Sequence, residues 1–195
     1  MPVKILVTAG SIRTGSFNVR LAALATKELS LLDADVTRIS LADYPMPIYD
    51  ADLEAKSGPP ENAIKLKRHF MASHGIFIAS PEYNASVTPL LKNALDWVSR
   101  VRERGDPTYA AFKGRVFAIA SASPGRAGGL RSLMALRQIL ELGCGALVIP
   151  EQVTIQRAES AFDDMDNIAD AGTANLFRTE LERLVEMSRM MVRGG

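Results

Sequence analysis

The strongest constraint on the fold is a regular alternation of two hydrophobic patterns along the 195 residues. Five short segments rich in Val, Ile, Leu and Phe have the composition of buried strands. They are residues 3–8, 36–41, 75–80, 115–121 and 146–149. The stretches between them, and the stretch after the last, carry apolar residues at spacings of three, four and seven. Such spacings predict helices with one buried face.

Strands that alternate with helices must be joined by crossover connections. These connections are right-handed in nearly all proteins and build a parallel sheet with helices on both faces. The sequence therefore predicts an α/β fold, a doubly wound five-stranded parallel sheet, in one domain over residues 1–195. Ligands bind such sheets beyond the carboxyl ends of the strands. We expect the loops after the first, third and fourth strands to carry the chemistry.

The loop after the first strand reads G-S-I-R-T-G-S-F-N over residues 10–18 and runs directly into a predicted helix. Glycines let backbone N–H groups turn inward, and the helix N-terminus attracts an anion. Hydroxyl, amide and guanidinium donors gather here, which favours a phosphate site over a simple helix cap by Ser16 or Asn18. Because the glycine spacing fits neither G-x-G-x-x-G nor a P-loop, the expected ligand is a terminal monophosphate.

The loop after the third strand reads P-E-Y-N-A-S over residues 81–86 and is followed by L-K-N-A-L-D-W over residues 91–97. A rigid turn with an aromatic ring and an amide can lie against a flat heterocycle and hydrogen-bond its edge. The loop after the fourth strand reads S-A-S-P-G-R-A-G-G over residues 121–129.

Together these three loops closely resemble the NAD(P)H-dependent FMN reductase family, which includes flavodoxin-like quinone, chromate and azo-dye reductases. The similarity covers roughly residues 3–150. The resemblance implies a flavodoxin-like fold, FMN as cofactor and NADPH or NADH as co-substrate. It also implies an enzyme that takes hydride onto the flavin and reduces a small acceptor: a quinone, chromate, an azo compound or free flavin.

The family's site residues carry over onto the matching positions of this sequence. For the FMN phosphate, the resemblance implies Ser11, Arg13, Ser16 and Asn18. For the ribityl chain and isoalloxazine, it implies Pro81, Glu82, Tyr83, Asn84 and Ser86. Beside the ring, it implies Ser121, Ser123 and Gly125. Some relatives have an aromatic residue or Gly where this chain has Ala85, so no side-chain stacking is expected there.

Other interpretations of these residues stay open at this point. Glu82 could cap or brace the helix that follows, whereas Tyr83 is expected at the flavin and Trp97 in the core. No catalytic side chain is expected, because the flavin performs the electron chemistry. The principal alternative function is a flavodoxin-like FMN electron carrier without a nicotinamide site. A second is a flavin-free interaction domain that shares only the fold.

Composition argues against several other classes of protein. With 23 Lys and Arg against 22 Asp and Glu, the formal net charge of +1 offers no broad field for nucleic acid or an anionic membrane. No apolar run is long enough to span a bilayer, no signal peptide is visible, and one cysteine forms no disulfide framework. We expect a cytoplasmic protein without a metal site, in which Cys144 is a buried small hydrophobe.

Residues 42–60 form a long, proline-rich and irregular stretch, expected to be a lid, an arm onto a partner subunit or a plain surface loop. Relatives are commonly homodimers or homotetramers, and the resemblance implies the same here, with Tyr44 or Tyr49 offered to a neighbour's site. A preference for NADPH would need a cation at the 2′-phosphate. The sequence does not choose among the candidates Arg100, Arg102, Arg104 and Arg126.

Overall fold

The five predicted strands form one parallel sheet. The computed structural model describes residues 2–194, with side chains described for residues 2–192, and its strand order is β2-β1-β3-β4-β5. The strands are β1 (Lys4–Ala9), β2 (Asp35–Arg38), β3 (Gly75–Ala79), β4 (Val116–Ala122) and β5 (Leu147–Ile155). The strand order reverses beside β1, so the loops after β1 and β3 leave the sheet at the topological switch point.

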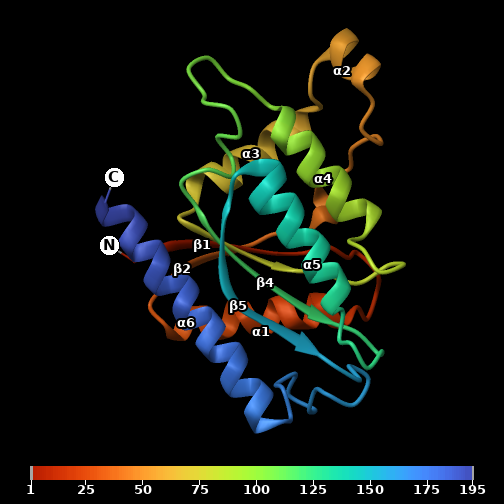
Figure 1. Cartoon of the computed structure of the whole chain (residues 1–195), viewed down its shortest axis with the longest axis vertical. Helices are drawn as coiled ribbons and strands as arrows, with labels where there is room; N and C mark the ends of the chain where they lie inside the picture. The colour runs from red at the N-terminus through yellow and green to blue at the C-terminus, as the bar shows by residue number, and fades with distance from the viewer. Residues whose placement is uncertain (1, 195) are drawn as a thin grey trace.

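Helices cover both faces of this sheet (Figure 1). They are α1 (Phe17–Leu31), α2 (Ala51–Ser57), α3 (Glu61–Ala72), α4 (Pro89–Arg100), α5 (Leu130–Gln138) and α6 (Ala171–Gly194), with a 3-10 turn η1 (Leu41–Asp43) and a π-helical turn η2 (Ile139–Gly143). Helices α1 and α6 enclose one hydrophobic core against the sheet, and α3, α4 and α5 enclose another. The predicted doubly wound architecture is confirmed.

The apolar stripes expected from the helical spacing face these two cores. Leu21 on α1 and Leu181 on α6 are fully buried on one side, as are Leu66 on α3 and Leu136 on α5 on the other. Trp97 has no exposed surface, so its assignment to the core is confirmed. Burial of apolar side chains on both faces of the sheet is the main source of the fold's stability.

Strand β5 is longer than predicted. The prediction ends it at residue 149, whereas the strand continues through Pro150 to Ile155. Proline is tolerated because β5 is an edge strand and because the ladder is irregular there. Phe117 pairs with Val148 and Ile119 with Gln152, so three β5 residues stand opposite the single residue between them on β4. Such a bulge allows a strand to pass over a proline.

The segment 42–60 is not irregular throughout, which corrects the expectation from its prolines. It contains helix α2 and packs onto α4 of its own chain. The Trp97 indole N–H donates to the carbonyl of Pro47 at 2.7 Å, and the Tyr49 ring meets the Trp97 ring edge-on at 5.0 Å between centroids. The segment therefore completes a small satellite core over α4.

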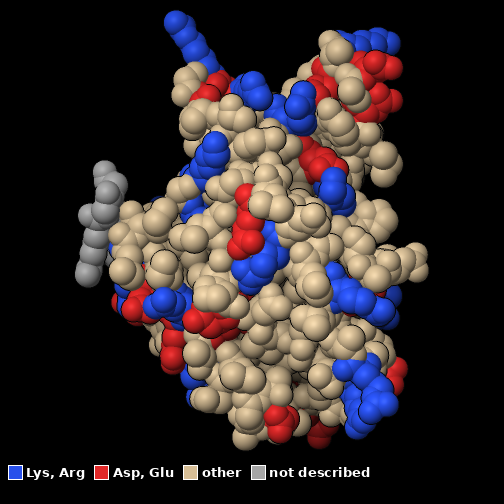
Figure 2. Space-filling view, in the orientation of Figure 1, with Lys and Arg blue, Asp and Glu red and all other residues tan. Residues whose placement is uncertain are grey.

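The sheet places its functional loops at one end. The loops that follow β1, β3 and β4 all leave the sheet on the right-hand side of Figure 1. Charges of both signs are scattered over the face seen in Figure 2, without one sign dominating. Among residues 2–194, no helix has the length and apolar character needed to span a membrane.

Candidate functional site

A cleft of about 100 Å³ lies where the three loops meet. Its lining combines the loop after β1, the turn after β3 and the end of β4. The lining residues are Ser11, Arg13, Ser16, Phe17, Asn18, Pro81, Glu82, Tyr83, Ala122, Ser123 and Pro124. Most of the residues predicted from the sequence are therefore brought together, although they lie more than 100 positions apart in the chain. Phe17, Ala122 and Pro124 also line the cleft but were not predicted. Phe17 fits the apolar stripe of the helix that it begins, so the sequence assigns it to the core.

The loop after β1 keeps its polar groups available. Ser16 occupies the N-cap position of α1, yet its side chain makes no capping hydrogen bond. The Ser11 hydroxyl accepts the Arg13 backbone N–H at 3.3 Å, which leaves the hydroxyl hydrogen free to donate. The first turn of a helix has N–H groups without partners inside the helix. Backbone and side-chain donors thus converge on the cleft.

Asn18 joins two elements of the fold, whereas Ser11, Arg13 and Ser16 keep polar groups available to the cleft. It is buried, and its side-chain amide bonds the backbone of Ala122 twice, at 2.8 Å through Nδ2 and 3.0 Å through Oδ1. It therefore does not cap α1 by a side-chain bond. The pair joins the start of α1 to the end of β4 and fixes the distance between two walls of the cleft.

The turn after β3 is a tight hairpin. Tyr83 N donates to Ser86 O and Ser86 N to Tyr83 O, both at 3.0 Å. Asn84 and Ala85 between them have φ values of 49° and 62°, the left-handed pair of a type I′ turn. Asn84 and Ser86 shape this turn but do not line the cleft, whereas the Tyr83 ring stands half exposed at its rim.

Glu82 braces the helix on the far side of the cleft. Its carboxylate forms an ion pair with the Arg131 guanidinium and accepts the Arg131 backbone N–H at 3.2 Å. Arg131 lies in the first turn of α5, where a carboxylate is favoured by the helix dipole. Glu82 therefore braces α5 and not α4, the helix that follows it in the chain, and it also lines the cleft.

The loop after β4 divides its predicted residues between the surface and the interior. Ser123 lines the cleft, and its hydroxyl accepts the Gly125 N–H at 3.3 Å. Ser121 is fully buried beneath Gly129, outside the cleft, and its hydroxyl has no hydrogen-bond partner in the described part of the chain. A Cβ at Gly129 would lie within 2 Å of that hydroxyl, so only glycine fits there. Gly125 is exposed beside the cleft without lining it.

Thr88 is a positioning residue that the sequence reasoning missed. Its hydroxyl donates to Gly10 O at 2.7 Å and accepts the Leu91 N–H at 3.2 Å, so it caps α4 and holds the loop after β1. A Cβ at Gly10 would press on Leu91 and Pro81 at 3.0–3.2 Å. The Thr-Pro pair, an N-cap followed by proline at N1, is the signal that could have identified it.

Other predicted candidates are engaged elsewhere in the chain. Arg100 pairs with Glu54, which also accepts the Tyr49 hydroxyl hydrogen at 2.9 Å, and these contacts fasten α2 to α4. The Tyr44 hydroxyl shares a 2.8 Å hydrogen bond with His69. Cys144 is buried, which raises the pKa of its thiol to about 11 and leaves it unreactive at neutral pH. Within the described part of the chain, no cluster of His, Cys, Asp and Glu could hold a metal ion.

Comparison with known proteins identifies the family. Residues 3–160 match the family described as NADPH-dependent FMN reductase. An NAD(P)H-dependent FMN reductase of Pseudomonas aeruginosa is 35% identical over 184 residues, 93% of each chain. A quinone reductase of Escherichia coli is 35% identical over 139 residues, 71% of this chain and 69% of the relative.

A solved structure agrees with these relatives. The flavoenzyme NAD(P)H:(acceptor) oxidoreductase FerB from Paracoccus denitrificans superposes with a TM-score of 0.78 and 27% identity, over 97% of this chain and 98% of that one. The flavodoxin-like fold, the enzyme class and the flavin and nicotinamide cofactors expected from the sequence are confirmed. The chain belongs to the NADPH-dependent FMN reductase family, whose members are NAD(P)H-dependent flavin oxidoreductases.

Proposed function

We propose that the cleft binds FMN through its phosphate and that the chain reduces quinones with NADPH or NADH. The observation that carries the proposal concerns the N-cap residue of α1. Ser16 lines the cleft there, and its hydroxyl makes no capping hydrogen bond to the helix. Ser11 and Arg13 add a hydroxyl and a guanidinium at the same place. These donors suit a dianionic phosphate at a helix N-terminus.

The size of the cleft supports a particular way of holding the cofactor. At about 100 Å³ it is smaller than the roughly 300 Å³ or more of a typical small-molecule site. We therefore assign the cleft to the phosphate and ribityl end. The flavin ring would lie over the rim, against Tyr83 and the backbone of residues 123–125, where one face stays open to a second substrate.

The other predicted site residues take supporting roles in this proposal. Asn18 positions the two walls of the cleft, and Glu82 holds the turn after β3 against α5. Asn84 and Ser86 shape the hairpin under Tyr83, and Pro81 lines the floor. Ser121 fills the space that the missing side chain of Gly129 leaves, and it supports the loop whose residues Ser123 and Gly125 would face the ring.

The chain's contribution to the reaction is binding and orientation. When bound, FMN supplies the chemistry by taking hydride from the nicotinamide and passing electrons to the acceptor. Because both substrates need the open face beside Tyr83, they must occupy it in turn, which predicts ping-pong kinetics. Alignment of the two rings by the rim of the cleft is the expected source of the rate.

A quinone is the favoured acceptor because relatives that share a third of their residues with this chain are named quinone reductases. Chromate, azo compounds and free flavin are the competing acceptors. The electron-carrier alternative requires that no nicotinamide reacts at the cleft.

The test is a visible spectrum of the protein after it is loaded with FMN. Anaerobic addition of NADPH or NADH should bleach the flavin band, and addition of a benzoquinone should restore it. Chromate added in place of the quinone measures how the chain chooses its acceptor. Failure of both nicotinamides to bleach a loaded protein would favour the electron carrier, and failure to load FMN would favour the flavin-free domain.

We also propose a cytoplasmic homodimer or homotetramer. Exposed apolar side chains on α5, η2 and β5 support the oligomer: Leu130, Met134, Leu142 and Leu147 are all more than 40% exposed. Apolar side chains that gather on a surface usually mark contacts with other chains. Light scattering of the eluted protein measures the mass, and a monomer at micromolar concentration would contradict the proposal. We propose no nucleic-acid partner, because a net charge of +1 gives no broad positive field to attract one.

A further inference from the structure

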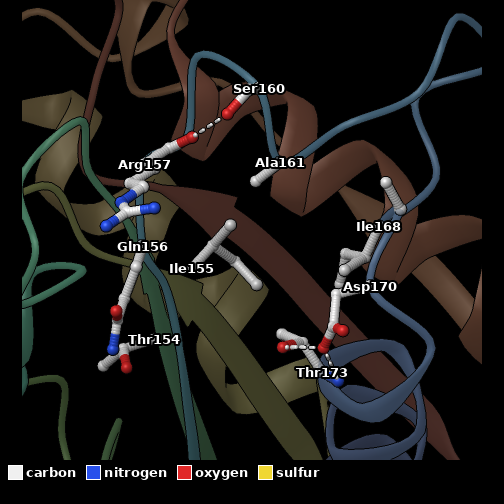
Figure 3. A pocket seen from close by; sticks show the side chains of 10 residues that line it. Thr154, Ile155, Gln156, Arg157, Ser160, Ala161, Ile168, Asp170 and Thr173 are labelled. Atoms are coloured by element: carbon white, nitrogen blue, oxygen red, sulfur yellow. Dashed lines mark hydrogen bonds between the residues drawn. The ribbon is translucent and has the colours of Figure 1, made fainter.

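A second cavity lies beside the cleft, at the carboxyl end of β5. Its volume is about 560 Å³, which falls inside the range of small-molecule sites. The cavity is bounded by the end of β5, by the loop that follows it and by the first turn of α6 (Figure 3). The lining residues are Thr154, Ile155, Gln156, Arg157, Ser160, Ala161, Ile168, Ala169, Asp170 and Thr173.

This cavity shares a wall with the loop that borders the cleft. Ser123 N donates to Ile155 O at 3.0 Å, and Ala158 N donates to Ser123 O at 3.1 Å. Gly128 packs so closely on Thr154 that a Cβ there would approach it to 2.9 Å. One residue, Ser123, therefore lines the cleft and is hydrogen-bonded to the chain that lines the cavity. A ligand held at the rim of the cleft could extend into the cavity across this wall.

The cavity's polar groups match a nucleotide. Arg157 stands at one wall with its backbone in the left-handed region, at φ 46°. Within residues 2–192, no hydrogen bond or ion pair engages its guanidinium, so its N–H groups can donate to a phosphate. On the opposite wall, Asp170 bonds the Thr173 N–H and hydroxyl through Oδ1 at 2.7 Å, and its other oxygen stays free for a ribose hydroxyl.

Apolar side chains occupy the space between these two walls. Ile155 and Ile168 are core residues that form the bottom of the cavity and expose only 1% and 7% of their surface, and the partly buried Ala161 lies between the walls in Figure 3. A flat purine ring can pack against such a surface while its sugar and phosphates reach the polar ends. The cavity thus combines a cation, a carboxylate and an apolar floor within one space.

We infer that this cavity binds the adenosine-phosphate half of NADPH or NADH, with Arg157 on its phosphates. The inference rests on the proposed function, because the nicotinamide half must lie on the flavin at the rim beyond Ser123. It places the co-substrate across the wall formed by Ser123 and Ile155. The reaction itself is unchanged, and Arg157 binds the co-substrate without touching the reacting atoms.

A rival cavity of about 280 Å³ lies on the other side of the loop after β1 and is bordered by Arg38, Ser40 and Asp43. It shares Ser11 with the cleft, so a dinucleotide reaching it would carry its pyrophosphate past the phosphate of FMN. Two phosphate groups in close proximity repel each other. The cavity at β5 avoids this repulsion, and it has twice the volume.

The test compares alanine variants at two arginines with three hydride donors. The variants Arg157→Ala and Arg38→Ala are assayed with NADPH, with NADH, and with reduced nicotinamide mononucleotide, which lacks the adenosine half. We expect Arg157→Ala to raise KM for NADPH or NADH by about tenfold or more, the loss of one charged hydrogen bond. It should leave kcat with the mononucleotide and the flavin spectrum unchanged. Arg157→Lys should recover part of the affinity, and Arg38→Ala should change nothing.

A binding measurement separates this inference from the proposed function. Titration calorimetry with ADP-ribose needs no turnover, and the wild type should bind it while Arg157→Ala binds it about tenfold more weakly. An unchanged KM and unchanged ADP-ribose affinity in Arg157→Ala would overturn the inference, as would an effect confined to Arg38→Ala. A wild type that binds ADP-ribose but oxidises neither nicotinamide would instead sink the proposed function.

Discussion

The side-chain amide of Asn18 uses both of its polar atoms on the backbone of Ala122, donating to its carbonyl at 2.8 Å and accepting its N–H at 3.0 Å. These residues lie 104 positions apart, at the start of α1 and the end of β4. Because both residues are 3% exposed, removal of the amide takes a hydrogen bond from each backbone group at a place where water has little access.

Replacing Asn18 with Ala should therefore act on stability and on the cofactor together. Loss of the amide leaves two buried backbone groups unpaired, and we expect the free energy of unfolding to fall by about 2 kcal/mol. FMN affinity should fall as well, because the two walls of the cleft lose their connection. Urea denaturation and FMN titration measure the two effects. The control is Asn62→Ala, which removes an exposed bond to Pro45 O and should change neither by much.

Ala85 sits in a conformation that suits glycine. Its φ of 62° places it in the left-handed region, which costs an L-residue about 1 kcal/mol or more. Relief of this strain by Ala85→Gly should raise the free energy of unfolding by about 1 kcal/mol. The extra conformational entropy of glycine in the unfolded state offsets part of that gain, and we expect the net effect to be stabilising. The opposite sign is expected for Ala23→Gly inside α1, where glycine costs about 1 kcal/mol. Destabilisation by both variants in urea would show that the turn is not strained.

Glu180 is a buried carboxyl on α6, and among the described residues the backbone N–H groups of Val153 and Ile119 face it, neither in a hydrogen bond of normal geometry. Burial raises its pKa well above the ordinary 4.5, and the charge of Glu151 adds to the shift. Arg183 lies on the same helix near Glu151, and Arg137 faces the site from α5 and lowers the pKa. The protonated form is therefore the one that the fold favours.

The sign of the pH dependence follows from that raised pKa. The contribution of Glu180 to the free energy of unfolding is fully present below pH 4.5, the ordinary pKa. It is lost as the pH rises from there through the pKa of the folded state. Between these two pKa values, the free energy of unfolding of the wild type should fall by up to about 1.4 kcal/mol per pH unit relative to that of Glu180→Gln. Urea midpoints between pH 5 and pH 8 measure this. Exposed Glu182→Gln is the control, and parallel curves for wild type and Glu180→Gln would refute the burial argument.

Much of the fold could be predicted because it depends on patterns that are local in the sequence. The buried strands and the apolar stripes of the helices, such as those that include Leu66 on α3 and Leu181 on α6, follow directly from hydrophobic spacing. The length of β5 could not be predicted in this way. Pro150 ends a strand by local rules, and only the pairing of β5 at the edge of the sheet, with a bulge against β4, permits it to continue.

The site was predictable as a set of loops but less so residue by residue. Ser11, Arg13 and Ser16 line the cleft because the loop after β1 carries them there, and their binding of a phosphate stays a prediction. Asn18 carries the same signal in the sequence, yet its partner is a backbone group in a distant strand. Ser121 is likewise buried by Gly129. Contacts formed by tertiary packing leave no periodic trace that sequence reasoning could find.

The measurement that tests the central claim most directly is the affinity of the double variant Arg13→Ala, Ser16→Ala for FMN and for riboflavin, which lacks the phosphate. Losing a charged and a neutral hydrogen bond should weaken FMN binding by about 100-fold. Riboflavin affinity should stay as in the wild type, so the preference for the phosphorylated flavin disappears. Unchanged FMN affinity in the folded double variant would contradict the assignment of the loop after β1 to the phosphate.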